Sequence, residues 1–183
     1  TVGLVQPNLE VKIIHPDTGE IVAIGETGEL CTKGYSVMLG YWNDTNKTAD
    51  AIVDGWMHTG DLATMDEDGY IKIVGRSKDM VIRGGENIYP VEIENYLYRH
   101  PKIRDVQVVG VPDKKFGEVL AAWIIPKKDS HLTEQDIRDF CRDHIAHYKV
   151  PTYMKFVEEF PMTVTGKIQK FKIVEAIKQE LGL

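Results

Sequence analysis

The sequence has few of the features that mark disulfide-rich, metal-binding or membrane proteins. Its 183 residues include two cysteines, Cys31 and Cys141, and their wide separation argues against both a disulfide framework and a zinc site. This cysteine usage favours a reducing compartment. The longest apolar runs, such as VLAAWII, are far shorter than the roughly 20 residues that a membrane-spanning helix needs.

Positive charge is also scarce. Lysine and arginine number 22 against 28 aspartates and glutamates, so the net charge is −6 and the pI is near 5.5. This balance gives no general electrostatic basis for binding nucleic acid or an anionic membrane, although a local basic site for a small anion is compatible with it. No secretory signal pattern opens the chain. We therefore expect a cytoplasmic protein, or one of the mitochondrial matrix if the source is eukaryotic.

Histidines offer little for metal binding. His144 and His147 are spaced to share one helix face, but the sequence around them supplies no third ligand. Their spacing is more typical of a solvated surface, and we predict no metal site in this chain.

The glycine-rich phosphate loop of the G-x-x-x-x-G-K-[ST] kind is missing as well. The stretch PMTVTGKIQK has proline where that loop needs its first glycine, and isoleucine follows Lys167. Two threonines and Gly166 nevertheless make a tight polar loop ahead of a predicted helix, which would present Lys167 as a point charge. A solvated lysine near a helix start is the ordinary alternative.

The first part of the chain, up to about residue 76, reads as β-rich. VKIIHPDTGEIV has two apolar runs around a Pro-Asp-x-Gly turn, which predicts a hairpin over residues 11–22. GELCTKG and GYIKIVGR predict further short strands. YWNDTNKTADAIVDGW predicts a short helix or turn region that ends at Asp54-Gly55.

The pattern of predicted elements changes after GRSKD, where helices and strands occur together. IYPVEIENYLYRHP predicts a helix with Pro90 in its first position. LTEQDIRDFCRDHI predicts another helix. Thr133 is its predicted N-cap, and Asp136, at the third helical position, would bond back to the cap residue. The segments VQVVGV, GEVLAAWIIP and YMKFVEEF predict strands, and IQKFKIVEAIKQEL predicts a final amphipathic helix.

These patterns predict an α+β fold class with a boundary near residues 76–79. We expect residues 1–77 to form a β-rich, incomplete subdomain. We expect residues 78–183 to form a small α+β domain with a three-stranded sheet and flanking helices.

Two further stretches carry groups that suit a nucleotide. In GWMHTGDLA, a Thr-Gly-Asp turn places the Asp61 carboxylate where it can accept hydrogen bonds from two adjacent hydroxyls, as on a ribose. In GRSKDMVIRGGENIYP, Arg76 offers a fork of donors, and Gly84-Gly85 lets the backbone approach a ligand closely. Each group has an ordinary alternative: a turn cap for Asp61 and a positive-φ turn for the glycines.

Taken in order, GYW…DGWMHTGD, GYIKIVGRSKDMVIRGGENIYPVEIE and PMTVTGKIQK resemble the adenylate-forming superfamily of acyl-CoA synthetases, luciferases and adenylation domains. The resemblance covers essentially the whole chain. GYSVMLGYW and TGKIQKF are most similar to fatty acyl-CoA synthetases of the medium-chain kind.

The resemblance implies roles for four residues at the nucleotide. Asp61 matches the carboxylate that holds the ATP ribose hydroxyls, and Arg76 matches an arginine that also contacts the ribose. Lys167 matches the catalytic lysine that supports adenylation. Lys78 matches the hinge about which the C-terminal domain swings.

The resemblance also implies a site for coenzyme A. Gly84 and Gly85 match the loop that lines the pantetheine channel, and Glu86 and Asn87 would edge that channel. Lys149, in HYKVP, would meet the CoA phosphates.

The implied substrates are ATP, CoA and a fatty acid, with Mg²⁺ held mostly by residues outside this chain. The TSGTTG-x-PK phosphate loop and the YG-x-TE turn of such enzymes are absent, and the chain opens at Thr1 without a helix cap. We therefore expect a piece of a longer enzyme that is inactive alone. A homo-oligomer is compatible with the sequence.

Two alternatives remain open at this point. The intact protein could load the phosphopantetheine of a carrier protein instead of CoA, or stop at the adenylate. The chain could also be a non-catalytic, partner-binding module, in which case residues 1–75 would have to form a closed sheet unaided.

Overall fold

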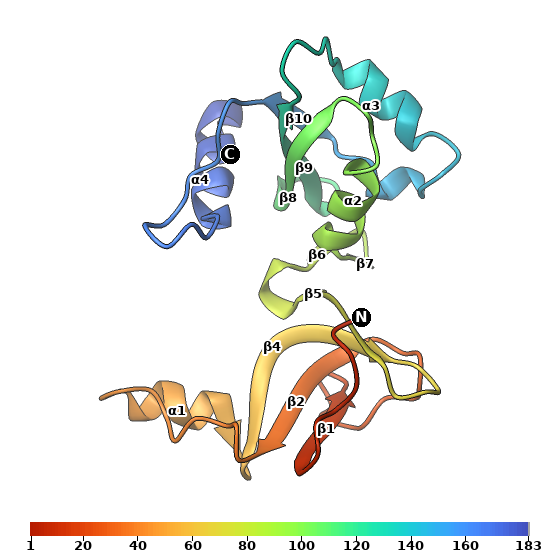
Figure 1. The fold of residues 1–183 in the computed structure, drawn as a ribbon. Coiled ribbons are helices and arrows are strands. Elements are labelled where there is room, and N and C mark those ends of the chain that lie inside the picture. The colour runs from red at the N-terminus through yellow and green to blue at the C-terminus, as the bar shows by residue number, and fades with distance from the viewer. Residues whose placement is uncertain (183) are drawn as a thin grey trace. The chain divides into compact units, whose positions relative to one another are not determined.

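The computed structural model describes residues 1–182 and divides into two compact units, Thr1–Lys78 and a second that begins at Asp79. Each unit has its own sheet, as Figure 1 shows. Within residues 1–182, no helix has the length and apolar character needed to cross a membrane.

The first unit is built on an antiparallel sheet of five strands in the order β1-β2-β4-β3, with β5 paired to β4. One helix, α1, lies before β3, and the Asp44 side chain caps it by accepting from the N–H of Lys47 at 2.9 Å. The elements are β1 (Leu9–Ile14), β2 (Gly28–Gly34), α1 (Thr45–Ala51), β3 (Ile52–Val53), β4 (Trp56–Met65) and β5 (Ile71–Arg76).

The hairpin predicted over residues 11–22 forms only in part. Its first arm is β1, but its second arm makes a single bridge, between Ile14 and Ile21. The ladder partner of β1 is β2, which pairs with all six of its residues. The longer pairing with β2 therefore defines the strand, and the returning arm leaves the sheet with Ile21 73% exposed.

The second unit has a mixed sheet in the order β10-β9-β6-β7, with β8 paired to β9. All the pairs are antiparallel except β9 with β10. The elements are β6 (Val81–Arg83), β7 (Glu86–Ile88), α2 (Pro90–Leu97), β8 (Ile103–Asp113), β9 (Gly117–Pro126), α3 (Glu134–Cys141), β10 (Tyr153–Phe156) and α4 (Lys170–Leu181). Two 3₁₀ turns cover Ser77–Asp79 and His147–Lys149.

The prediction of a three-stranded sheet in this unit was wrong in its count. The three predicted strands are present as β8, β9 and β10, and the hairpin of β6 and β7 adds two more. Each arm of that hairpin has only three residues, which is too short for an alternating pattern to be read from sequence.

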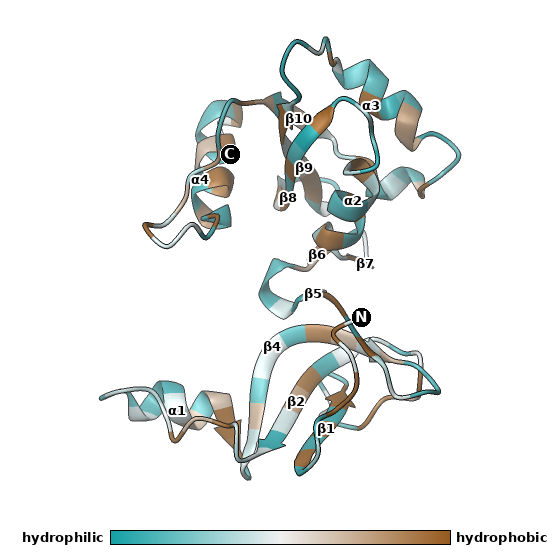
Figure 2. Ribbon diagram, viewed as in Figure 1, coloured by the Kyte–Doolittle hydropathy of each residue, from teal (hydrophilic) through white to brown (hydrophobic). Residues whose placement is uncertain are grey.

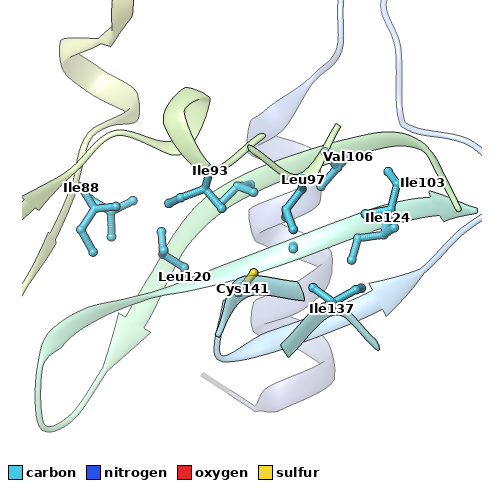
Figure 3. Close-up of a cluster of buried hydrophobic side chains, with 12 residues drawn as sticks. Ile88, Ile93, Leu97, Ile103, Val106, Leu120, Ile124, Ile137 and Cys141 are labelled. Carbon is cyan, nitrogen blue, oxygen red and sulfur yellow. The ribbon is translucent and has the colours of Figure 1, made fainter. Parts of the chain in front are cut away.

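The long strands β8 and β9 are buried on both faces. Helices α2 and α3 cover one face and α4 covers the other (Figure 1). Figure 3 shows the first core, which includes Val106, Leu120 and Ile124 of the sheet and Leu97 and Ile137 of the helices. The second core sets Val109, Val111, Val119, Ala121 and Ile125 against Ile173 and Ile177 of α4. Figure 2 shows hydrophobic and hydrophilic residues alternating along α4, as expected for a helix with one buried face.

Helix ends follow the predicted chemistry at most positions. Pro90 occupies the first turn of α2, and Thr133 and Asp136 form the predicted capping box of α3. The C-terminal end of α3 differs from prediction, because the helix stops at Cys141. Arg142 turns to an extended ψ of 132°, and Asp143 adopts a positive φ of 63°, which the sequence pattern does not reveal.

One buried ion pair joins both helical layers at the open edge of β8. Glu94, 7% exposed, accepts the backbone N–H of Val108 at 2.8 Å and the ammonium of Lys170 at 2.8 Å. Lys170 also donates to the Val108 carbonyl at 3.2 Å. In the part of the chain that the structure describes, β8 pairs with β9 alone, so the two side chains serve backbone groups at an edge that lacks a second neighbour strand.

We expect Glu94→Ala to lower the free energy of unfolding by about 2–3 kcal/mol, because it leaves the buried N–H of Val108 without an acceptor and the largely buried ammonium of Lys170 without a counter-charge. Glu94→Gln keeps an acceptor for Val108 and should cost less. Urea denaturation measures the change, and Glu175→Ala, on the exposed side of α4, is the control. Equal stability of the Glu94→Ala and Glu175→Ala variants would contradict this role.

The buried His100 makes stability depend on pH. Burial lowers the pKa of its imidazole below the ordinary 6.5; nearby Lys102 and Lys127 act in the same direction and Asp136 opposes them. The unfolded chain therefore binds more protons than the folded one just below pH 6.5. Stability is full above that pH and is lost progressively as the pH falls from about 6.5 toward the lowered value.

We expect His100→Asn, which can still accept the Lys102 N–H as Nδ1 does at 3.2 Å, to flatten this dependence. Unfolding midpoints measured at about pH 7.5 and about pH 5.5 compare the two proteins. An equal loss of stability in both over this range would rule out His100 as the cause.

Candidate active site

Asp61 and Arg76 face one another across neighbouring strands. They are register partners in the β4–β5 ladder, and Arg76 Nε donates to Asp61 Oδ1 at 2.7 Å. Their side chains are 30% and 51% exposed, respectively. The pair uses one carboxylate oxygen and one guanidinium nitrogen, so a second oxygen and two terminal nitrogens remain for a ligand. A carboxylate and a guanidinium side by side suit a polyhydroxyl group such as a ribose.

Lys167 lies in a tight turn that is closed by the bridge between Met162 and Ile168, just before the start of α4. Thr163 closes the turn: its backbone N–H donates to the Lys167 carbonyl at 2.8 Å, and its hydroxyl accepts the Lys167 N–H at 3.0 Å. Gly166 has a φ of 79°, which glycine adopts without strain. The backbone of Lys167 is thus held by its own loop while its side chain is exposed.

Gly84 and Gly85 form the two-residue turn of the β6–β7 hairpin. Their φ values, 59° and 90°, are both positive, which accounts for the Gly-Gly sequence. The N–H of Gly84 donates to the Phe116 carbonyl at 2.8 Å, so the turn is attached to the β8–β9 connection. Glu86 and Asn87 follow on β7 and are exposed.

Lys149 lies near this turn but already has a partner. Its ammonium donates to both carboxylate oxygens of Glu92, at 2.7 and 2.8 Å. The carbonyl of the preceding Tyr148 accepts from Arg83 at 2.7 Å, which connects the Lys149 segment to the end of β6. A phosphate would therefore have to compete with Glu92 for this lysine. Lys78, the predicted hinge, is the last residue of the first unit and sits inside a 3₁₀ turn.

Within residues 1–182, one group of three side chains has the spacing of metal ligands: Glu29, Cys31 and His58, with ligand atoms within 4.8 Å of one another. The group does not fit Mg²⁺, which prefers an octahedron of oxygens. It also suits a soft metal poorly, because burial and then the charge of Glu29 raise the pKa of the Cys31 thiol to about 11. Both Glu29 oxygens already accept hydrogen bonds, from His58 and from the backbone of Gly60. We therefore assign Glu29, Cys31 and His58 no role in holding Mg²⁺.

Sequence reasoning missed Glu29, His58, Arg83 and Phe116 at these sites. Glu29 and Gly60 are 31 positions apart, and Arg83 stacks on the Phe116 ring with 4.8 Å to its centroid. No local pattern links such residues, although Glu29 stands in the predicted strand GELCTKG.

Two family models match the chain. Residues 1–42 match the family described as AMP-binding enzyme, and residues 92–167 match the one described as AMP-binding enzyme C-terminal domain. The medium-chain acyl-CoA ligase ACSF2, mitochondrial, is 50% identical in Bos taurus and 52% identical in Danio rerio, over 100% of this chain. The chain spans about 30% of the length of these relatives.

Solved structures of AMP-binding enzymes also match most of the chain. ATP-bound MatB from Rhodopseudomonas palustris matches 96% of the chain with a TM-score of 0.90 and 35% identity, and 35% of its own chain is covered. The anthranilate CoA ligase AuaEII in complex with anthranoyl-AMP matches 97% of the chain with a TM-score of 0.87 and 37% identity, and 35% of its chain is covered. The chain therefore belongs to the adenylate-forming, AMP-binding enzymes, and it matches a C-terminal portion of such enzymes.

Proposed function

We propose that the protein containing this chain is an ATP-dependent fatty acyl-CoA ligase, which forms an acyl adenylate and then an acyl-CoA. The observation that carries the proposal is the Asp61–Arg76 pair, a carboxylate and a guanidinium joined at 2.7 Å with free polar atoms, in a chain whose relatives are named acyl-CoA ligases. ATP-bound and acyl-AMP-bound structural neighbours support a nucleotide as its ligand.

In the first step the fatty-acid carboxylate attacks the α-phosphorus of ATP, a P–O bond forms, and pyrophosphate leaves. Asp61 accepts hydrogen bonds from the ribose hydroxyls, and Arg76 donates to the ribose. Negative charge grows on the phosphate oxygens in the transition state, so the ammonium of Lys167, held on a closed turn, stabilises that state more than the ground state.

In the second step the thiolate of CoA attacks the acyl carbon, and AMP leaves. Gly84 and Gly85 line the path of the pantetheine arm, where the lack of side chains allows close approach. Glu86 and Asn87 border that path, and Lys149 exchanges Glu92 for a CoA phosphate. These CoA contacts rest on the family resemblance.

The two steps need different groups at one nucleotide, and a domain swing would exchange them. Residues 1–77 belong in this proposal to the large AMP-binding domain, and residues 78–183 form the small mobile domain that turns about Lys78. The matches of residues 1–42 and 92–167 to two separate family models support this division.

A medium-chain fatty acid and free CoA are the preferred substrates, because the 50–52% identical relatives are named medium-chain acyl-CoA ligases. An amide bond synthetase, McbA from Marinactinospora thermotolerans, matches at 35% identity and a TM-score of 0.89, so a different acceptor is the alternative. The ACSF2 relatives are named as mitochondrial, which supports a location in the mitochondrial matrix if the source is eukaryotic.

The intact enzyme tests the acceptor directly. With ATP and a series of fatty acids, AMP release should require CoA, and acyl-CoA should form fastest with medium chains. Release of AMP with a carrier protein or an amine, and none with CoA, would replace the proposed acceptor.

We expect Lys167→Ala in the intact enzyme to slow acyl-adenylate formation by about 10²–10³-fold, the effect of losing one preorganised charged donor. Thioester formation from a supplied acyl adenylate should be largely retained. Single-turnover assays of each half-reaction measure the split, with the exposed Lys172→Ala as control. An equal loss in both half-reactions would contradict the assigned role.

The hinge is tested by Lys78→Pro, because proline holds φ near −65° and so restricts rotation there. We expect near-normal adenylation and a thioester step that is slowed by at least about tenfold. Lys78→Ala, which removes the side chain but not the backbone freedom, should carry out both steps. Normal progress of the proline variant through both would count against the swing.

A further inference from the structure

Asp61 is the last residue of an unusually large bulge in the β2–β4 ladder. Glu29 pairs with Leu62 and Cys31 pairs with His58, so three residues of β4, 59–61, lie opposite the single residue Leu30. An ordinary bulge opposes two residues to one. The insertion leaves backbone groups of the Thr-Gly-Asp segment outside the ladder, and such groups need other partners.

Side chains provide those partners. The carboxylate of Glu29 accepts the N–H of Gly60 through Oε1 at 3.0 Å. The hydroxyl of Thr59 donates to the Leu30 carbonyl at 2.7 Å and accepts the N–H of Asp61 at 3.1 Å. Gly60 has a φ of 71° with open space around it, so glycine serves the backbone conformation rather than close packing.

The Glu29 carboxylate is itself oriented. Its other oxygen, Oε2, lies 2.9 Å from His58 Nδ1, and the side chain is only 15% exposed. His58 is the last residue of β4 in register before the bulge. Glu29 therefore joins the residue before the bulge to the glycine inside it, across 29 and 31 positions of the sequence.

This connection decides where Asp61 points. Side chains alternate between the faces of a strand, so a change of one residue in the bulge would turn Asp61 to the opposite face. On the other side of β4, Asp61 is the register partner of Arg76 and accepts its Nε–H. If the bulge were not held in place, Asp61 and Arg76 would keep their charges, but their side chains would no longer point to the same site.

We propose that Glu29 is a positioning residue for the nucleotide: through its hydrogen bond to Gly60 it holds the Asp61 carboxylate in the orientation that binds the ribose. The proposal rests on the ribose role of Asp61 proposed above. Glu29 acts through the bulge, because its two carboxylate oxygens are already paired with His58 and with the N–H of Gly60.

The test measures sugar discrimination in the intact enzyme, as the ratio of kcat/KM for adenylation with ATP to that with 3′-deoxy-ATP or 2′-deoxy-ATP. Glu29→Ala should lower this ratio by about five- to tenfold, the scale of one misplaced charge-assisted hydrogen bond. The KM for the fatty acid should not change. Glu29→Gln keeps an oxygen for the Gly60 N–H and should restore most of the ratio.

Glu26→Ala is the matched control, since Glu26 also accepts a backbone N–H, from Ala23 at 3.1 Å, in a loop of the same unit. It should leave the ratio unchanged. If Glu29→Ala does not fold, Glu29→Asp is measured instead, because it keeps the charge while withdrawing the oxygens by one methylene.

Asp61→Ala separates the two claims. If Asp61→Ala leaves the sugar ratio intact, the ribose role fails and the inference about Glu29 falls with it. If Asp61→Ala lowers the ratio while Glu29→Ala or Glu29→Asp does not, Glu29 does not position Asp61 and the ribose role stands. Glu29→Ala added to Asp61→Ala should cause no further loss of discrimination, and an additive loss would overturn the positioning role.

Discussion

The antiparallel register between β8 and β9 is the constraint on which the second unit depends. Both strands are buried on both faces, with α2 and α3 on one side and α4 on the other. A shift of one residue would exchange the side chains of the two cores. Val119 would then stand where Leu120 now fills space, and Leu120 would enter the core that Val119 now fits, so each core fixes the register that the other needs. The turn carrying Lys167 depends on this arrangement, because α4 begins three residues later.

The buried charges of this unit serve the same arrangement. Strand β8 has one free edge, and the Glu94–Lys170 pair satisfies Val108 there while joining α2 to α4. The Lys149–Glu92 pair, with side chains 21% and 48% exposed, lies nearer the surface and contributes less to stability.

In the first unit, strand register matters mainly because it places the candidate site residues, not because it aligns a large core. The buried cluster there is small, with Ile13, Ala63 and Ile71 at its centre. Ladder pairing and side-chain hydrogen bonds therefore carry much of the local order. Asp61 and Arg76 meet because they are partners in the β4–β5 ladder, on one side of the register shift between Leu62 and Ala63. Their half-exposed pair can open without the penalty of unpairing buried charges.

Features that depend on a few neighbouring residues were open to prediction. Pro90 and the Thr133–Asp136 box act within one helical turn, and a nearly continuous apolar run marks β9, so these elements were found from sequence. The turn at Lys167 was also read from its threonines and glycine. The short β6–β7 hairpin and the early end of α3 escaped, because three-residue arms and a positive φ at Asp143 leave no periodic signal.

What the amino-acid order alone determined, then, was the set of elements, their caps and turns, and the motifs that indicate an adenylate-forming enzyme. The tertiary structure alone decided which groups meet: Glu29 with Gly60, Glu94 with Lys170, and Asp61 with Arg76. The physical reason is distance along the chain. Caps, turns and alternation follow from interactions between near neighbours, whereas contacts across 15 to 76 positions depend on strand register and helix packing, which become defined only when the whole unit folds.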